Sequence, residues 1–573
     1  MGIKIQTLLP TGCALLGGAL YAFSNVGFGC WPLVFICLIP LWFALDKCQQ
    51  GPVKTSALLG FLFGLSVFAM GYPWLLTLTG EFIDGGLILG ILLWCGIGIW
   101  FALGFSIYAV MYRALRKTNL PQVVAGTTPL ILLEWQQVNL FPSYAGAALI
   151  SNPILVQIAD LGGPLLLSAF VALLNCCIYS IGSAIAPRLR IRFWQKRKPN
   201  NSSTTQTPPR PSNRPVNAIV STVLLISSTV LYGYFQLEKY QYDENSGKPA
   251  SKSDALNIGV VQTNLVMLSK QELSLRSHST HLNQSRELLA QDPVDLLIWP
   301  ETAYVRGLRR PLPIDAQFIR AEIEAPLLFG GTSVWQQDGQ RVSANSVFLS
   351  NKEGVIDQVY DKNQLIPFAE YLPKIKDIPF FSTLNNILGN ELVEKYATLS
   401  KKLFPNYQEF RPGEHSNALQ LDDISIGTPI CYEVIHPDYI REMVNTSRPE
   451  LIVTLANDAW FGDTQEPWIH LSLARLRAIE HRLWVVRATN SGISAIIDPS
   501  GNITARTGLH TKENLRATVY PKTSYTVYAH YGNWVGWLAL LLILFLTLPS
   551  LLFTLPLRLQ RFSRWLSPFF TNS

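Results

Sequence analysis

Charged residues are scarce in this chain. Only 15% of its 573 residues are Asp, Glu, Lys or Arg, whereas 49% are hydrophobic. Soluble domains usually carry about 25% charged residues. This composition disfavours a wholly water-soluble protein and indicates segments embedded in lipid. The length leaves room for a membrane domain and a separate globular domain.

The sequence also lacks the cysteine and histidine spacing of a metal site. Seven of the eight cysteines lie in or beside apolar runs within the first 180 residues, and only Cys431 lies in the long polar stretch. His278 and His281 are three residues apart without a third ligand nearby, so we expect both on the surface. We therefore expect no metal and no other cofactor.

Eight apolar runs are candidates for membrane-spanning helices, each of which needs about 20 mostly apolar residues. They lie at 7–27, 30–46, 56–77, 87–111, 122–139, 162–186, 217–236 and 533–556. The run 30–46 is short, and a proline and a glutamate interrupt 122–139. We expect a membrane domain of seven spans in residues 1–236, and a final span with a basic tail in 532–573.

Lysine and arginine are confined to alternate loops. The basic segments are 46–55, 112–121, 187–215 and the tail after 556. The loop 78–86 carries acidic residues only. Because basic loops stay in the cytoplasm, both termini are expected inside the cell and the polar segment 237–531 outside. The loop 187–215 is rich in polar residues and proline, which is typical of disorder.

The polar segment 237–531 has the pattern of one α/β domain. Short runs rich in Val, Ile and Leu alternate with helical patterns near 270–290 and 466–482. The predicted strands are 256–262, 294–299, 326–334, 343–350, 424–430, 451–456, 484–489 and 493–498. Functional side chains in such folds gather at strand ends.

Three strand-end residues have matching chemistry. Cys431 could be a nucleophile, which requires the thiolate. Glu301 could accept the thiol proton as general base, and the Lys362 ammonium could stabilise an oxyanion. Taken singly, each residue has a structural explanation: a buried small side chain, a helix cap and a solvated charge, respectively. Together they predict an acyl-transfer site.

Longer motifs make this combination specific. In order, they are W-P-E-T at 299–302, D-K-N-x-L-x-P-F-x-E-Y at 361–371, C-Y-E at 431–433, N-D-A-W-F-G at 457–462, A-R-L-R-A-I-E at 474–480, R-A-T-N-S-G-I-S-A at 487–495 and I-D-P-S-G at 497–501. On these motifs the chain resembles the bacterial apolipoprotein N-acyltransferase family of the nitrilase superfamily. The membrane half is similar through A-D-L-G-G at 159–163. The resemblance implies a nitrilase-like αββα sandwich in the soluble segment.

The resemblance also implies a reaction. Such enzymes move an acyl chain from a membrane phospholipid to a cysteine, here Cys431, as a thioester. The acceptor is the N-terminal α-amine of a diacylglyceryl-modified apolipoprotein. The implied location is the bacterial inner membrane, with the catalytic domain on the periplasmic side and no nucleic acid partner. Supporting roles are implied for four further residues, Glu370, Tyr432, Glu433 and Trp460.

Two positions depart from the family pattern, and other functions stay open. Ala369 stands where a glycine is usual, and Gln271 lies near an expected tryptophan. Asn345 and Asn490 are expected in structural hydrogen bonds rather than in the site. A membrane-tethered amidase or nitrilase could use the same triad, with water resolving the thioester. An inactive scaffold is disfavoured by the intact triad, and the spans favour a lipid substrate.

We expect Cys431→Ala to abolish acyl transfer while the chain stays folded in the membrane, because the substitution removes only the thiol that forms the thioester. Turnover in isolated membranes, measured with the amount of inserted protein, checks this. A variant that still transferred acyl chains at the original rate would contradict the assignment of the nucleophile.

Overall fold

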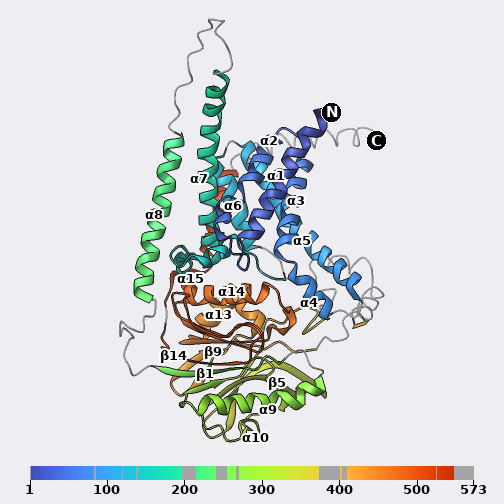
Figure 1. The fold of residues 1–573 in the computed structure, drawn as a ribbon, viewed down its shortest axis with the longest axis vertical. Coiled ribbons are helices and arrows are strands. Elements are labelled where there is room, and N and C mark those ends of the chain that lie inside the picture. The colour runs from blue at the N-terminus through green and yellow to red at the C-terminus, as the bar shows by residue number, and fades with distance from the viewer. Residues whose placement is uncertain are drawn as a thin grey trace, which may run out of the picture.

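The computed structural model describes residues 2–82, 86–118, 120–136, 140–195, 214–240, 255–265, 270–372, 401–402, 409–523 and 525–547. A helical half stands over an α/β half in Figure 1. Most of the basic loop 187–215 lies outside the described residues. Its first residues, 187–195, continue a helix that ends at Gln195, so the expectation of disorder is wrong there. For 196–213, which lie outside the described residues, disorder stays a prediction.

Four described helices are long and apolar enough to cross a membrane, over Val53–Gly71, Ile88–Lys117, Leu155–Ser183 and Val216–Tyr240. These correspond to α3 (Val53–Gly71), α5 (Gly86–Lys117), α7 (Ala159–Gln195, with its preceding turn) and α8 (Arg214–Tyr240). Shorter apolar helices cover Leu8–Ser24, within α1 (Gly2–Ser24), and Trp534–Thr547. The expected number of eight spans is not confirmed.

The two runs that were the weaker candidates for spans do not form long single helices. The run 30–46 folds as a 3-10 turn, η1 (Trp31–Phe35), followed by the separate helix α2 (Ile39–Lys47). Pro40 lies in the first turn of α2 because a residue without an N–H fits there and not in a helix interior. The run 122–139 forms α6 (Gln122–Trp135), which has 14 residues.

Small residues let the helices of the bundle approach closely. A Cβ added at Gly60 of α3 would lie 2.2 Å from the Phe105 carbonyl oxygen of α5, and one at Gly18 of α1 would lie 2.4 Å from the Phe63 carbonyl oxygen. Close backbone contact of this kind is a main source of helix association in lipid. Helix α8 stands to one side of this bundle in Figure 1.

The α/β half contains two sheets. The first has eight strands in the order β14-β1-β2-β5-β6-β7-β4, with β3 paired to β5. Its strands are β1 (Leu256–Gln262), β2 (Leu296–Ile298), β3 (Tyr304–Arg309), β4 (Ile314–Asp315), β5 (Leu327–Gln337), β6 (Gln340–Ser350), β7 (Val355–Asp361) and β14 (Glu513–Val519).

The second sheet has six strands in the order β13-β12-β11-β10-β9-β8. Its strands are β8 (Leu419–Leu421), β9 (Ile424–Gly427), β10 (Leu451–Ala456), β11 (Trp484–Thr489), β12 (Ala495–Ile497) and β13 (Ile503–Arg506). Strand β10 pairs in parallel with both β9 and β11. Strands β10 and β11 are buried at every position, as their largely apolar sequences predict, whereas β9 is buried only in its second half.

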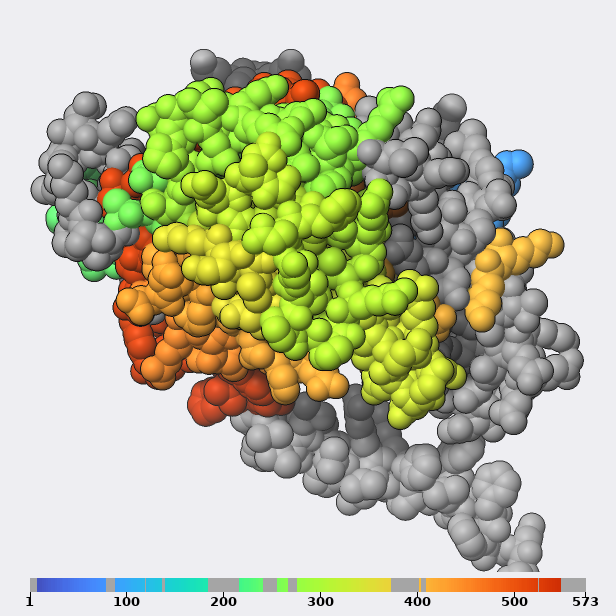
Figure 2. All heavy atoms as spheres, turned by 90° about the horizontal axis from the view of Figure 1, so that it is seen from below, coloured from blue at the N-terminus to red at the C-terminus, as the bar shows by residue number. Residues whose placement is uncertain are grey.

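Helices cover both outer faces of the paired sheets. Helices α9 (Lys270–Leu289) and α10 (Gln317–Arg320) lie on the side away from the bundle. Helices α13 (Pro437–Ser447) and α14 (Glu466–His481) lie between the second sheet and the bundle. These four layers form the α/β sandwich expected from the sequence. Figure 2 views it from the outer side, where the green and yellow surface belongs to the segment carrying α9 and α10.

The surface assignment of the histidine pair on α9 is wrong. His281 is buried, and its Nδ1 lies 2.8 Å from the Ser277 carbonyl oxygen. The half-buried His278 has its Nε2 2.7 Å from the Ile319 carbonyl oxygen. Both rings pack against Trp299, because this face of α9 covers the first sheet.

A buried ion pair joins the two halves of the molecule. Arg482 ends α14 in the left-handed conformation and donates two hydrogen bonds to Asp160 Oδ2, at 2.7 and 3.0 Å. It also donates to Gln157 Oε1 at 2.6 Å. Tyr232 of α8 donates to the other Asp160 oxygen at 2.8 Å. One cation thus connects the α/β half, α7 and, through Asp160, α8.

We expect Arg482→Met to lower the free energy of unfolding by about 3–5 kcal/mol, because it leaves a buried carboxylate without its cation. Asp160→Asn combined with Arg482→Met should cost less than the sum of the single changes, because the two residues act as one unit. Thermal unfolding in detergent micelles measures both.

Arg286→Met is the matched control, because it removes an exposed ion pair with Glu322. It should leave the unfolding midpoint nearly unchanged. Additive effects at 160 and 482 would show that the pair does not hold the halves together.

Candidate active site

The three predicted site residues each follow a strand. Glu301 comes after β2, Lys362 directly after β7, and Cys431 begins the turn η6 (Cys431–Ile435) shortly after β9. The turn at Glu301 packs closely on β5, since a Cβ at Gly330 would lie 2.6 Å from its Cα. The exposed fractions of Glu301, Lys362 and Cys431 are 8%, 1% and 6%, so all three are buried.

The Lys362 ammonium lies between two carboxylates. Its Nζ donates to Glu370 Oε1 at 2.9 Å and lies 3.7 Å from Glu301 Oε1. Burial alone would lower the pKa of Lys362, but the charges of Glu370, Glu301 and Cys431 outweigh it and raise that pKa above its usual range. Lys362 is therefore a permanent cation in a buried site.

Asn345 connects the same two carboxylates. Its side-chain Nδ2 donates to Glu301 Oε1 at 2.8 Å and to Glu370 Oε1 at 2.9 Å. Its backbone carbonyl oxygen accepts from the Lys362 backbone N–H at 2.8 Å. The expectation of a role apart from the site is wrong for Asn345. Asn490, in contrast, bonds Thr263 and backbone groups of the Leu265 segment, which fits the structural role expected for it.

The proposed base has an environment that favours proton uptake. Burial raises the pKa of Glu301, and the charge of Glu370 acts in the same direction. The Lys362 charge and hydrogen bonds from Asn345 and the Cys431 thiol lower the pKa, but burial prevails. A carboxylate with a raised pKa that already accepts a hydrogen bond from the thiol can take up its proton.

The thiol itself is protonated at rest. Burial raises the pKa of Cys431 well above its usual range, and Glu301 adds to this effect. The Lys362 charge and a hydrogen bond from the Asn457 backbone N–H lower the pKa without reversing the shift. If Cys431 is the nucleophile, it therefore needs a base at the moment of attack, and Glu301 is placed to serve as one.

Glu433 and Tyr432 contact the surroundings of the site rather than its centre. Glu433 accepts backbone hydrogen bonds from Asn363, Gln364 and Ile430 at 2.6, 3.0 and 2.7 Å, so it ties the loop after Lys362 to the segment before Cys431. It also accepts from a tyrosine hydroxyl in β7 at 2.7 Å. Burial raises the pKa of Glu433.

Tyr432 reaches the helical half. Its hydroxyl donates to the Leu140 carbonyl oxygen, and its ring meets Phe141 edge-on with the centroids 5.7 Å apart. Tyr432 therefore contacts the loop between α6 and α7.

Trp460 lies partly buried in the turn η7 (Asp458–Phe461).

Of the two positions that depart from the family pattern, the structure describes the side chain of Ala369 but not that of Gln271. Ala369 is half-buried in a turn in which the Glu370 N–H donates to the Ile366 carbonyl oxygen at 2.9 Å. The Ile366 N–H in turn donates to Glu370 Oε2 at 2.8 Å, so this turn fixes the carboxylate. The side chain of Gln271 lies outside the described residues.

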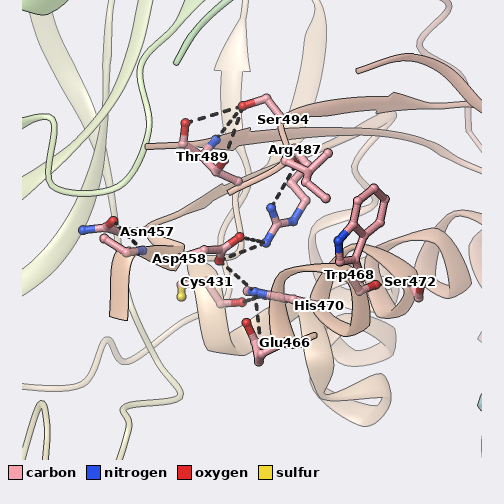
Figure 3. Close-up of polar contacts among 12 residues, drawn as sticks. Cys431, Asn457, Asp458, Glu466, Trp468, His470, Ser472, Arg487, Thr489 and Ser494 are labelled. Atoms are coloured by element: carbon pink, nitrogen blue, oxygen red, sulfur yellow. Dashed lines mark hydrogen bonds and ion pairs between the residues drawn. The ribbon is translucent and has the colours of Figure 1, made fainter. Parts of the chain in front are cut away.

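A buried charged cluster lies directly behind Cys431 (Figure 3). Arg487 donates to both oxygens of Asp458, at 3.1 and 2.8 Å, and His470 Nδ1 lies 3.2 Å from Asp458 Oδ1. The opposite ring nitrogen, Nε2, lies 3.1 Å from the Cys431 carbonyl oxygen. Glu466 Oε1 lies 3.9 Å from His470 Nδ1.

The pKa values of Asp458, Glu466 and His470 are shifted by burial and by the neighbouring charges of the cluster. Arg487 and His470 lower the pKa of Asp458 despite its burial. Burial and the Asp458 charge raise the pKa of Glu466, whereas burial and Arg487 lower that of His470. The ligand atoms of Asp458, Glu466 and His470 lie within 4.8 Å of one another, but Arg487 already supplies the positive charge that a metal would bring to Asp458.

Sequence reasoning did not identify this cluster. Two signals were available: Glu466 and His470 are four residues apart at the start of a predicted helix, and the N-D-A-W-F-G motif precedes them. The partners from β11 and η6 were not foreseeable, because only the fold brings them to this helix.

Two family models cover most of the chain. Residues 257–527 match the family described as carbon-nitrogen hydrolase, and residues 17–177 match the apolipoprotein N-acyltransferase N-terminal domain. The apolipoprotein N-acyltransferase of Geobacter metallireducens is 27% identical over 526 residues, which is 88% of either chain. That of Rhodopseudomonas palustris is 28% identical over 541 residues, or 90% of either chain.

This chain is similar to apolipoprotein N-acyltransferases over most of its length. Its two matched regions follow the order of the helical half and the α/β half, and the triad lies within the hydrolase region. Among solved structures, Nit3 of Saccharomyces cerevisiae, a nitrilase superfamily member, matches 48% of this chain and 93% of its own at 18% identity, with a TM-score of 0.35. A Nesterenkonia amidase (C145A mutant) from the same superfamily matches 48% and 94% at 16% identity, with a TM-score of 0.30.

We expect Lys362→Met to move the pH dependence of Cys431 reactivity to higher pH. The Lys362 charge lowers the pKa values of both Glu301 and Cys431, so removing it raises both. The rate of Cys431 alkylation by iodoacetamide, followed by peptide mass spectrometry across pH, measures the shift.

The exposed Lys352 provides a matched control, because Lys352→Met removes the same charge from the surface. That variant should follow the original pH profile. An unchanged profile in Lys362→Met, or a shift to lower pH, would contradict the electrostatic role given to Lys362.

Proposed function

We propose that this chain transfers an acyl chain from a membrane phospholipid to the N-terminal α-amine of diacylglyceryl-cysteine in apolipoproteins, completing lipoprotein maturation. The convergence of Glu301, Lys362 and Cys431 in one buried cluster carries the proposal. The names of the relatives support the reaction, and the geometry supports the residue roles.

The first half-reaction forms a thioester. Glu301 accepts the proton of the Cys431 thiol, and the sulfur attacks the ester carbonyl carbon of the phospholipid. The negative charge that develops on the carbonyl oxygen is stabilised by the Lys362 ammonium. The ester C–O bond then breaks, and the leaving lysophospholipid oxygen takes the proton back from Glu301.

The second half-reaction forms an amide. The free α-amine of the apolipoprotein attacks the thioester carbonyl, and Glu301 accepts a proton from the amine. The C–S bond breaks, and the departing sulfur regains that proton. In both steps Glu370 and Asn345 hold Lys362 and Glu301 in place through the bonds described above.

The contact between Tyr432 and the helical half supports a lipid donor. Tyr432, next to Cys431, touches the loop at Leu140 and Phe141. A cavity of about 400 Å³ lies in the helical half beyond this loop and is lined mainly by apolar side chains of α5 together with Ser143. An acyl chain entering from the bilayer would have apolar surface on this side of the site.

We propose further that the eight apolar runs all cross the bacterial inner membrane, with both termini cytoplasmic and the catalytic domain of 237–531 periplasmic. Residues 1–236 and 532–573 then form the membrane part. The Arg113 side chain contacts the basic loop at Gly51 and Pro52, at one end of the bundle. Trp74, at the other end, meets Phe461 of the catalytic half with centroids 5.6 Å apart. The basic end and the catalytic end are thus opposite, as this orientation requires.

Mass spectrometry of the Cys431 peptide after incubation with phospholipid vesicles tests the proposal. We expect a fatty acyl thioester on Cys431, and its loss on addition of a diacylglyceryl-cysteine peptide should yield N-acylated peptide. Cys431→Ser, which cannot form a thioester, is the control.

The product identifies the function. Free fatty acid in place of N-acylated peptide would favour the membrane-tethered hydrolase that uses the same triad. Turnover without any adduct on Cys431 would overturn the mechanism, and absence of any turnover with a correctly folded chain would favour an inactive scaffold.

A further inference from the structure

The backbone at Cys431 has a conformation that needs external support. Its φ is +49°, in the left-handed region that residues other than glycine rarely adopt. Such a conformation costs about 1–3 kcal/mol and persists only when neighbouring groups hold it. The preceding Ile430 is extended and pairs with Leu455 of β10, so the chain turns sharply at the nucleophile itself.

Two elements outside η6 hold this turn. The Asn457 backbone N–H donates to the Cys431 sulfur, and His470 of α14 lies 3.1 Å from the Cys431 carbonyl oxygen through Nε2. A carbonyl oxygen only accepts, so Nε2 carries the proton of this bond. The nucleophile is therefore held at its side chain by one element and at its carbonyl by another.

The His470 ring also contacts Asp458 through Nδ1, the nitrogen that does not face Cys431. Figure 3 shows its ring between Cys431 and Asp458, with Arg487 on the far side of Asp458. His470, Asp458 and Arg487 are all buried; Arg487 donates to Asp458, and His470 Nδ1 lies 3.2 Å from Asp458 Oδ1. A Cβ at Gly492 would lie 1.9 Å from Asp458 Oδ2, so even the backbone opposite leaves the carboxylate no room to move.

We propose that His470 is a positioning residue that sets the direction of the Cys431 thiol, by holding the strained carbonyl of the nucleophile against the Asp458–Arg487 pair. His470 touches neither substrate nor the reacting sulfur. It acts on the rate at which the thiol reaches Glu301 and the ester, and not on the affinity for lipid. The inference rests on the proposed role of Cys431 as nucleophile.

A pair of amide substitutions at His470 separates positioning from packing. In His470→Gln the amide nitrogen falls near the place of Nε2 and can still donate to the Cys431 carbonyl. In His470→Asn the shorter amide falls near the place of Nδ1, so it can reach Asp458 but not the carbonyl. Both variants bury one neutral amide in the same site.

The rate constants for Cys431 alkylation by iodoacetamide and for thioester formation from phospholipid vesicles are measured in the full-length chain, with thermal unfolding alongside. We expect His470→Gln to retain most of both rates. His470→Asn should lose about 10- to 100-fold in both, as is typical when a group that orients a reactive residue is removed. The KM for phospholipid should change little in either variant.

Equal losses in the two variants would overturn the proposal, and so would full activity of His470→Asn. If His470→Asn does not fold, Asp458→Asn provides the second test, since it weakens the hold on the ring at nearly constant shape. If Asp458→Asn were alkylated at the same rate as the unaltered chain, the role given to Asp458 in holding His470 would be overturned. Absence of any thioester in the unaltered chain would instead overturn the proposed function, while alkylation would still report on His470.

Discussion

The site depends on one buried ammonium. Lys362 is 1% exposed and lies within hydrogen-bonding or ion-pairing distance of two carboxylates, Glu301 and Glu370. Taking these charges out of water costs several kcal/mol per ion, which only close pairing and further hydrogen bonds can offset. Asn345 and the Ile366 N–H supply those bonds. Strand β6 and the loops after β2 and β7 therefore meet around this one cation.

The same cation explains why the two carboxylates can differ in role. Glu370 holds Lys362 at 2.9 Å and accepts the Ile366 N–H, so its oxygens are occupied. Glu301 is farther from the ammonium, at 3.7 Å, and shares a hydrogen bond with the Cys431 thiol. Glu370 thus neutralises the charge, while Glu301 retains a raised pKa and can exchange a proton with the Cys431 thiol.

Much of the fold could be predicted from sequence because burial leaves a pattern. Strands β10 and β11 match their predicted bounds, since both are mostly apolar, are buried at every position and run through the interior of the second sheet. Strands such as β13 and β14, with alternating or partly exposed residues, had no predicted counterpart. The triad could be predicted because its motifs are specific. His470 and Asn345 could not, because their roles arise from contacts with residues 39, 44 and 25 positions away.

The joint at Arg482 bears on how the molecule is made. Asp160 precedes Arg482 by 322 residues, so it leaves the ribosome long before its partner. Domains emerge and fold in order during synthesis, beginning at the N-terminus. Because Arg482, Gln157 and Asp160 share these hydrogen bonds, this buried contact between the two halves can form only after the chain has been made as far as Arg482. The segment that carries Asp160 is therefore made well before the α/β half that docks on it.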